Sequence, residues 1–281
     1  EWRALDHVAL TESHEPVPND PDDVFDHFHV NSIQVDHDGN LLISARHTDT
    51  VYKLDRRTGR VIWRLGGKRS DFDFGPGARF HSQHDARRQP DGDLTLFDNS
   101  NPPKVREESR AIRLRLDETT MTASLVQAID HPLQLSSESQ GNAQVLPGGD
   151  VMVSWGSQPY FSRFSPSGRL RFDAQFPPDT DIYRAYHASW RGRPPGRPAI
   201  SVDVVDDELT AYASWNGATE IRRWELLTGP RPDQLSPVAS SRWEGFESTL
   251  TAEHDQRYVA VRAVDDSGDT LGVSRVRRPR L

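Results

Sequence analysis

A pattern that recurs three times along the chain is the feature that most limits how it can fold. The three copies span residues 31–65, 83–101 and 142–176. Each copy reads as an alternating strand, a D-G or G-G turn, a second apolar strand, and then a third and a fourth strand. Glycine suits such hairpin turns because it accepts a positive φ. Four short antiparallel strands per copy predict the blades of a β-propeller.

Three blades are too few to close a propeller ring, which usually has four to eight. We therefore expect further blades upstream, and we interpret residues 1–10 as the outer strand of one of them. The alternative is a β-sandwich built from the same repeats. Unpaired blade edges are an aggregation hazard. Whether the chain forms a homo-oligomer stays open at this point.

Residues 191–198, with the sequence RGRPPGRP, predict a linker between two domains. Residues 1–190 form the predicted propeller part. Residues 199–281 contain short strands at close spacing, which predict a β-sandwich resembling a fibronectin type III domain with Trp215 in its core. The whole chain is therefore predicted to be an all-β protein of two domains.

Composition excludes several classes of function. The formal net charge is −8 and no basic stripe dominates the chain, so we expect no nucleic-acid partner. The chain has no cysteine, which excludes thiolate metal sites and cysteine nucleophiles. No apolar run has the length of a membrane span. Neither a GxGxxG motif nor a P-loop is present, and we expect no cofactor.

Alignment of the copies on their turn glycines predicts where a site lies. In a blade, the start of the first strand and the end of the second lie on one face near the central channel. Histidine, asparagine or arginine occupies these positions in the first two copies. The residues expected to converge at one channel mouth are His29, Asn31, Arg46, His84 and Asn99. His81 lies three residues before His84 and is a further candidate.

This set is rich in hydrogen-bond donors and contains no carboxylate, which suits an oxyanion. Arg46 would supply a forked pair of hydrogen bonds, and a histidine would supply donors or a nucleophile. A hard metal ion needs several carboxylate oxygens, so we expect no metal. A zinc site formed by His29, His81 and His84 is an alternative, and the nearby arginine charge counts against it.

A structural interpretation stands beside the functional one, because a histidine at the start of a blade often caps a strand. Three costly polar groups that face one point favour a function for His29, Arg46 and His84 together. Strand alternation predicts that Arg46 and His47 point to opposite faces. Asp26 is a candidate acceptor that orients a histidine, although a surface carboxylate is equally ordinary.

Three segments resemble the bacterial aryl-sulfate sulfotransferases of the actinobacterial type. They are DHFHVNSIQVDHDGNLLISARHTDT from Asp26, FHSQHDA from Phe80 and LFDNS from Leu96. The resemblance is most specific in the H-x-N-S, S-x-R-H and Q-H-D-A motifs, which are rarer than generic blade sequence. It implies a six-bladed propeller, of which this chain holds about three blades, and an enzyme that uses no nucleotide sulfate donor.

The resemblance also implies a mechanism, in which a histidine takes the sulfuryl group from an aryl sulfate and passes it to a phenol. The implied catalytic residues are His84 as the nucleophile, His29 and Arg46. The expected substrate-binding residues are Asn31, Asn99 and His81. Small-molecule aryl sulfates and phenols would be the partners, and the location would be secreted or in the cell envelope.

Two other functions stay open at this point. The first is a propeller that binds an anionic or aromatic ligand without turnover, since propellers serve many functions. The second is a propeller hydrolase such as a lactonase, which generally needs a carboxylate-bound metal.

Overall fold

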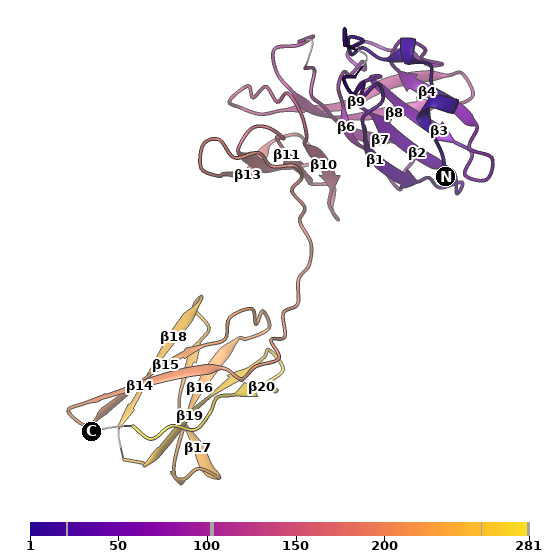
Figure 1. Cartoon of the computed structure of the whole chain (residues 1–281). Coiled ribbons are helices and arrows are strands. Elements are labelled where there is room, and N and C mark those ends of the chain that lie inside the picture. Colours follow the sequence, from indigo (N-terminus) through magenta and orange to yellow (C-terminus); the bar gives the residue numbers. More distant parts are fainter. Residues whose placement is uncertain (21, 102–103, 254, 280–281) are drawn as a thin grey trace. The chain divides into compact units, whose positions relative to one another are not determined.

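The computed structural model describes residues 1–20, 22–101, 104–253 and 255–279 (Figure 1). It divides into two compact units, Glu1–His187 and Ala188–Leu281. Both units are built from strands, so the prediction of an all-β protein is confirmed. Within the described ranges, no helix is long and apolar enough to cross a membrane.

The first unit contains three antiparallel sheets that follow one another along the chain. The first blade comprises β1 (Val30–Val35), β2 (Leu41–Ala45), β3 (Thr50–Leu54) and β4 (Val61–Gly66). The second comprises β6 (His84–Arg88), β7 (Leu94–Asp98), β8 (Arg110–Asp117) and β9 (Thr122–Asp130), with β5 (Asp73–Phe74) parallel to β9. The third comprises β10 (Asn142–Val145), β11 (Val151–Ser154), β12 (Tyr160–Phe164) and β13 (Leu170–Gln175). Apart from β5, each strand of a blade pairs with the next strand of the same blade, which confirms the predicted propeller blades.

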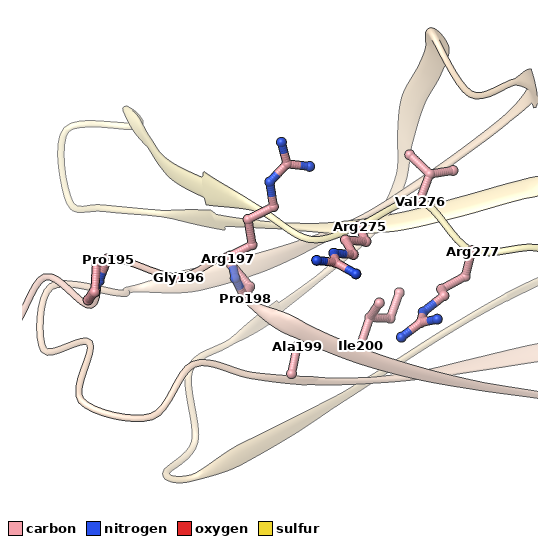
Figure 2. A pocket seen from close by; sticks show the side chains of 9 residues that line it. All are labelled: Pro195, Gly196, Arg197, Pro198, Ala199, Ile200, Arg275, Val276 and Arg277. Carbon is pink, nitrogen blue, oxygen red and sulfur yellow. The ribbon is translucent and has the colours of Figure 1, made fainter.

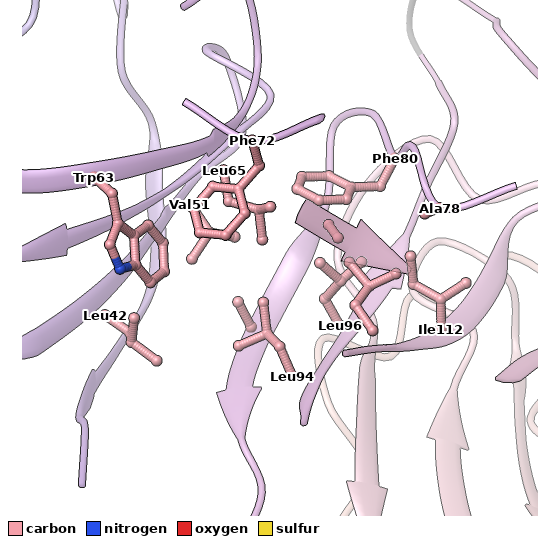
Figure 3. Packing of buried hydrophobic residues seen from close by; sticks show 13 residues of the cluster. Leu42, Val51, Trp63, Leu65, Phe72, Ala78, Phe80, Leu94, Leu96 and Ile112 are labelled. Atoms are coloured by element: carbon pink, nitrogen blue, oxygen red, sulfur yellow. The ribbon is translucent and has the colours of Figure 1, made fainter. Parts of the chain in front are cut away.

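The first two blades share one apolar core. Trp63, Val51 and Leu65 of the first blade face Leu94 and Leu96 of the second, and all five side chains are almost fully buried (Figure 3). The first strands of the blades also meet, since β6 contacts β1 and β2, and β10 contacts β6 and β7. This packing brings the starts of the three inner strands together, and the candidate residues of the site lie there.

Residues 1–10 form no strand, so the prediction of an outer blade strand there is wrong. The segment instead contains two short 3-10 helices, η1 (Ala4–Asp6) and η2 (Leu10–Glu12). Val8 is buried in the core of the first blade with Phe28 and Tyr52, and Trp2 packs against the same core. The Trp2 indole also donates to the backbone oxygen of Gly59 at 2.9 Å. The apolar residues of this segment therefore cover the first blade rather than extend another.

The second unit is a sandwich of two antiparallel sheets. One sheet has the order β14 (Ala199–Val205), β15 (Glu208–Ser214), β18 (Glu247–Glu253). The other has the order β17 (Gln234–Arg242), β16 (Arg223–Arg231), β19 (Tyr258–Val264), β20 (Thr270–Val273). Their facing side chains form a single core in which Trp224 is the fully buried tryptophan, while Trp215 packs against it half-buried. The closer resemblance to fibronectin type III stays a prediction.

Candidate functional site

His84 opens β6 and is the centre of the site. Its side chain is held in one tautomer, since Nδ1 lies 2.8 Å from Asn99 Oδ1 and 3.1 Å from the Ser82 backbone oxygen. Both partners accept, so Nδ1 carries the proton. Nε2 accepts a hydrogen bond from the backbone N–H of Gln140 at 3.2 Å. The lone pair of the imidazole is therefore on Nε2.

The imidazole of His84 is electrically neutral over the physiological pH range. The residue is only 3% exposed. This burial lowers the pKa of His84 to about 4, and the charges of Arg46 and His29 act in the same direction, against the hydrogen bonds with Asn99 and Ser82. A neutral imidazole has a lone pair that can act as a nucleophile, whereas its protonated form has none.

Asn99 follows β7 and fixes the orientation of His84. Its Nδ2 donates to the backbone oxygens of Ser137, at 3.2 Å, and Gln140, at 3.1 Å. These bonds identify the amide oxygen as the atom that faces His84. Asn99 is completely buried. It therefore ties the nucleophile candidate to the loop that precedes the third blade.

Arg46 lies in the turn after β2, next to this group. Its backbone N–H donates to the His29 backbone oxygen at 2.9 Å. Its Nη1 donates to His47 Nε2 at 2.7 Å and its Nη2 to the Glu138 backbone oxygen at 3.1 Å. Its Nε is buried and has no hydrogen-bond partner among the described residues. A buried cationic N–H without an acceptor favours the binding of an anion at this point.

The prediction that Arg46 and His47 point to opposite faces is wrong. Strand β2 ends at Ala45, and residues 46–49 form a turn. Strand alternation no longer applies in a turn, so both side chains reach the same side and bond to each other.

His29 is oriented by a carboxylate. Its Nδ1 lies 2.5 Å from Asp26 Oδ2, and its ring lies against that of His47 with centroids 4.5 Å apart. Burial opposes ionisation of Asp26, but the hydrogen bond with His29 and the charges of His29 and His47 outweigh it and lower the pKa of Asp26. An ionised Asp26 holds the proton of His29 on Nδ1, which leaves Nε2 for proton exchange.

Asp26, His29 and His47 each place one possible ligand atom within 4.8 Å of the others. The two ring nitrogens of His47 are already engaged, by Arg46 at 2.7 Å and by the Asp26 backbone oxygen at 2.5 Å. A metal ion would also lie beside the guanidinium charge of Arg46. The donors of this group therefore suit an anion better than a cation.

Asn31 and His81 differ in their relation to His84. The Asn31 side chain donates to the Gln83 backbone oxygen at 2.7 Å and accepts from the Asp85 backbone N–H at 3.2 Å, so it holds the chain on both sides of His84. His81 instead pairs with Asp49 at 3.1 Å, and this hydrogen bond raises the pKa of His81. Among the described residues, no contact of its side chain joins it to the group around His84.

The backbone around the site is strained. Four residues that are not glycine have positive φ, namely His29 at 50°, Ser82 at 52°, Asp85 at 54° and Gln140 at 67°. Each such conformation costs about 1–3 kcal/mol, and such strain gathers at functional sites. Its concentration on both sides of His84 supports the assignment of this group as the candidate active site.

Sequence reasoning missed Gln140 and Arg184. Gln140 occupies in the third copy the position of Gln83 in the second, so alignment of the copies was the signal that would have found it. Gly141 follows with φ 98°, and a Cβ atom there would lie 2.5 Å from the Phe97 ring, which explains the glycine at the position aligned with His84. Arg184 donates to the Asn31 backbone oxygen at 2.6 Å. It lies in a segment outside the repeats, where no sequence pattern predicts this contact.

Comparison with known proteins gives a match to one family model and several structural matches of low sequence identity. Residues 1–177 match the model of the Arylsulfotransferase (ASST) family. No curated protein matches the chain. Among solved structures, virginiamycin B lyase from Staphylococcus aureus is 11% identical, with 90% of this chain and 85% of that one covered and a TM-score of 0.34. The PQQ-bound aldose sugar dehydrogenase from Streptomyces coelicolor is 13% identical, with coverages of 87% and 80% and a TM-score of 0.37.

Proposed function

Since this chain belongs to the arylsulfotransferase family, we propose that it moves a sulfuryl group from an aryl sulfate to a phenol through a sulfohistidine on His84. The observation that carries this proposal is the state of His84, a buried neutral imidazole with its proton fixed on Nδ1 and its lone pair on Nε2. On the family basis we also propose small-molecule substrates and a location outside the cytoplasm. Association into a homo-oligomer stays a prediction.

In the first half of the reaction, Nε2 of His84 attacks the sulfur atom of the aryl sulfate. The N–S bond forms, and the S–O bond to the aryl group breaks with its electron pair going to the aryl oxygen. The ring then carries a positive charge, and its Nδ1–H stays between the oxygens of Asn99 and Ser82, which stabilise that charge. Asn99 is thus a positioning residue that also supports the charged intermediate.

The negative charge on the sulfuryl group must be stabilised by hydrogen-bond donors during the transfer. Arg46 offers its guanidinium group, whose charge acts on His84 and whose Nε–H has no partner among the described residues. The Gln140 N–H, which engages Nε2 in the free protein, must release the lone pair before attack. After the N–S bond has formed, the same N–H lies close to the sulfuryl oxygens and can donate to them. Gly141 supplies the backbone freedom for this small adjustment.

His29 transfers the proton in both half-reactions. In this proposal it starts the cycle with protons on both ring nitrogens, and Nε2 gives its proton to the departing aryl oxygen in the first half-reaction. Neutral Nε2 then takes a proton from the attacking phenol in the second, which restores the starting state. Asp26 keeps the Nδ1 proton in place during both steps and holds the ring in its orientation. The phenol oxygen then bonds to sulfur, the N–S bond breaks, and neutral His84 returns.

The test is to trap the covalent intermediate. Mixing the chain with 4-nitrophenyl sulfate and no acceptor is expected to add the mass of one sulfuryl group, and peptide mapping is expected to place it on His84. A chase with phenol is expected to remove the added mass and yield phenyl sulfate. Mass spectrometry of the intact protein and its peptides checks both steps.

Tight binding of the aryl sulfate by folded protein without an added mass would contradict the enzyme proposal. It would support the second candidate, a binding propeller without turnover, which the engaged lone pair of His84 Nε2 favours. An added mass on a residue other than His84 would contradict only the assignment of His84 as the nucleophile, and not sulfuryl transfer itself.

The lowered pKa of His84 predicts an unusual pH dependence. The reactive neutral form is present above the pKa, so kcat/KM for 4-nitrophenyl sulfate should fall on the acid side with a midpoint of about 4 rather than 6.5. This donor is suited to the test because its leaving group departs without a proton. A pH–rate profile measures the midpoint, and a midpoint near 6.5 would contradict the assignment of the buried imidazole.

Stability must be followed in the same experiment. Unfolded His84 takes up a proton below 6.5 and the folded residue does so only near 4, so its contribution to stability is lost as the pH falls through this interval. Circular dichroism at each pH therefore has to show folded protein before a rate is assigned to the chemistry.

A further inference from the structure

The second unit carries a groove with a strongly basic lining. Residues 195–200 form one side of it and residues 275–277 the other, and its volume is about 920 Å³. Arg275 and Arg277 extend from the terminal segment toward Pro198 and Ile200 (Figure 2). Arg197 adds a third guanidinium group, and none of the described residues that line the groove carries a carboxylate.

These three arginines differ from most others in the unit. Arg193 pairs with Glu220, Arg222 with Asp266, Arg262 with Glu225 and Arg231 with Asp233. By contrast, the guanidinium groups of Arg197, Arg275 and Arg277 make no ion pair and no hydrogen bond with any residue that the structure describes. Three unpaired cations along one groove leave a local positive field that attracts anions.

The groove is longer than a single small anion requires. It adjoins a second hollow of about 650 Å³, and the two share residues 195–198 and Val276. The second hollow is lined by Trp215 and Leu271. Asp233 is the one carboxylate among the described residues of its lining, and it is paired with Arg231. A row of cations followed by an aromatic side chain fits an extended ligand.

We propose that this groove binds a polysaccharide chain that carries sulfate or phosphate esters. Guanidinium groups bind such tetrahedral oxyanions through paired hydrogen bonds, and Trp215, which lines the second hollow, offers an apolar surface to a sugar ring. A nucleic acid fits less well, because duplex binding usually neutralises six or more phosphates, and only three free arginines line the groove. The proposal does not rest on sulfuryl transfer by the first unit.

The test compares defined ligands on the full chain. Titration calorimetry at about 0.1 M salt would use a heparin hexasaccharide, its desulfated form, a phosphorylated dextran oligomer of similar length and a thymidine oligonucleotide. Binding of the sulfated or the phosphorylated oligomer, at least about tenfold tighter than that of the desulfated sugar, is expected. The oligomer that binds more tightly shows whether the groove prefers sulfate or phosphate esters.

The arginines are then removed together in the variant R197Q/R275Q/R277Q. Each exposed pair of an arginine with a ligand anion contributes modestly. Loss of all three is expected to lower the affinity for the preferred oligomer by at least about tenfold. The matched control is Arg242→Gln. Arg242 is exposed, lies outside both hollows and forms no ion pair with any described residue, and the affinity of this variant is expected to stay within twofold. Both variants are checked for an unchanged melting temperature.

Three results would overturn the proposal: equal binding of sulfated and desulfated hexasaccharide, unchanged affinity in the triple variant, or tighter binding of the oligonucleotide. Sulfuryl transfer to phenol by the triple variant is expected to equal that of the original chain. The proposal for the groove and the proposal for the active site are therefore tested independently of each other.

Discussion

Replacing His84 with alanine is expected to lower kcat/KM for sulfuryl transfer by about 10⁴-fold or more, because the nucleophile itself is removed. The variant keeps Arg46, His29 and Asp26, so it still offers donors to the sulfate and a route for the proton. These groups bind and polarise the donor, but neither N–S bond formation nor a covalent intermediate is then available. Activity and the added sulfuryl mass should disappear together.

Release of 4-nitrophenolate with phenol as acceptor measures this effect. The matched control is His131→Ala, which removes an equally buried imidazole that pairs with Asp173 in the third blade at 3.2 Å. That variant is expected to keep kcat/KM within a few-fold at temperatures well below its melting point. If His84→Ala retains more than about a tenth of the original kcat/KM, His84 does not carry the sulfuryl group.

The second large effect concerns stability and comes from a buried ionic network between the first two blades. Asp36 lies 3.0 Å from Lys53 Nζ and accepts from Arg88 Nε at 3.1 Å, and these three side chains are at most 8% exposed. The variant Asp36→Ala leaves two buried cations short of a carboxylate. We expect the free energy of unfolding of the first unit to fall by about 3 kcal/mol, the usual range for a broken buried pair.

Urea denaturation measures this change, followed on the transition of the first unit because two units can unfold separately. Asp38→Ala is the control, since Asp38 lies 2.9 Å from the same Lys53 nitrogen but is 47% exposed. Its loss is expected to cost 1 kcal/mol at most. Equal effects of the two substitutions would show that burial does not decide the strength of this network.

The same network predicts a pH dependence of stability. Burial opposes ionisation of Asp36, but the hydrogen bonds from Arg88, His37 and Lys53 outweigh it and lower its pKa below 3.8. The contribution of Asp36 to stability is therefore complete at pH values above its pKa in the unfolded chain. It is lost as the pH falls through the pKa of Asp36 in the folded protein. The difference in stability between the original chain and Asp36→Ala should shrink accordingly in acid.

Several features of this protein were readable in the sequence because they are set locally. Strand alternation and turn glycines such as Gly92 determine the register of each blade, and the period of the repeat determines which residues open each inner strand. Alignment of the copies therefore named His84, Asn99 and Arg46 as neighbours, and the structure joins His84 to Asn99 directly. The all-β fold and the blades follow from the same pattern.

Only the tertiary structure decided how these neighbours are used. The amide that faces His84 Nε2 belongs to Gln140, 56 residues away, and Arg184 reaches Asn31 across 153 residues. The burial that keeps His84 neutral also comes from the packing of three blades. Local patterns specify strands, turns and register, whereas burial, proton positions and the contacts between distant loops arise only when the blades pack against one another.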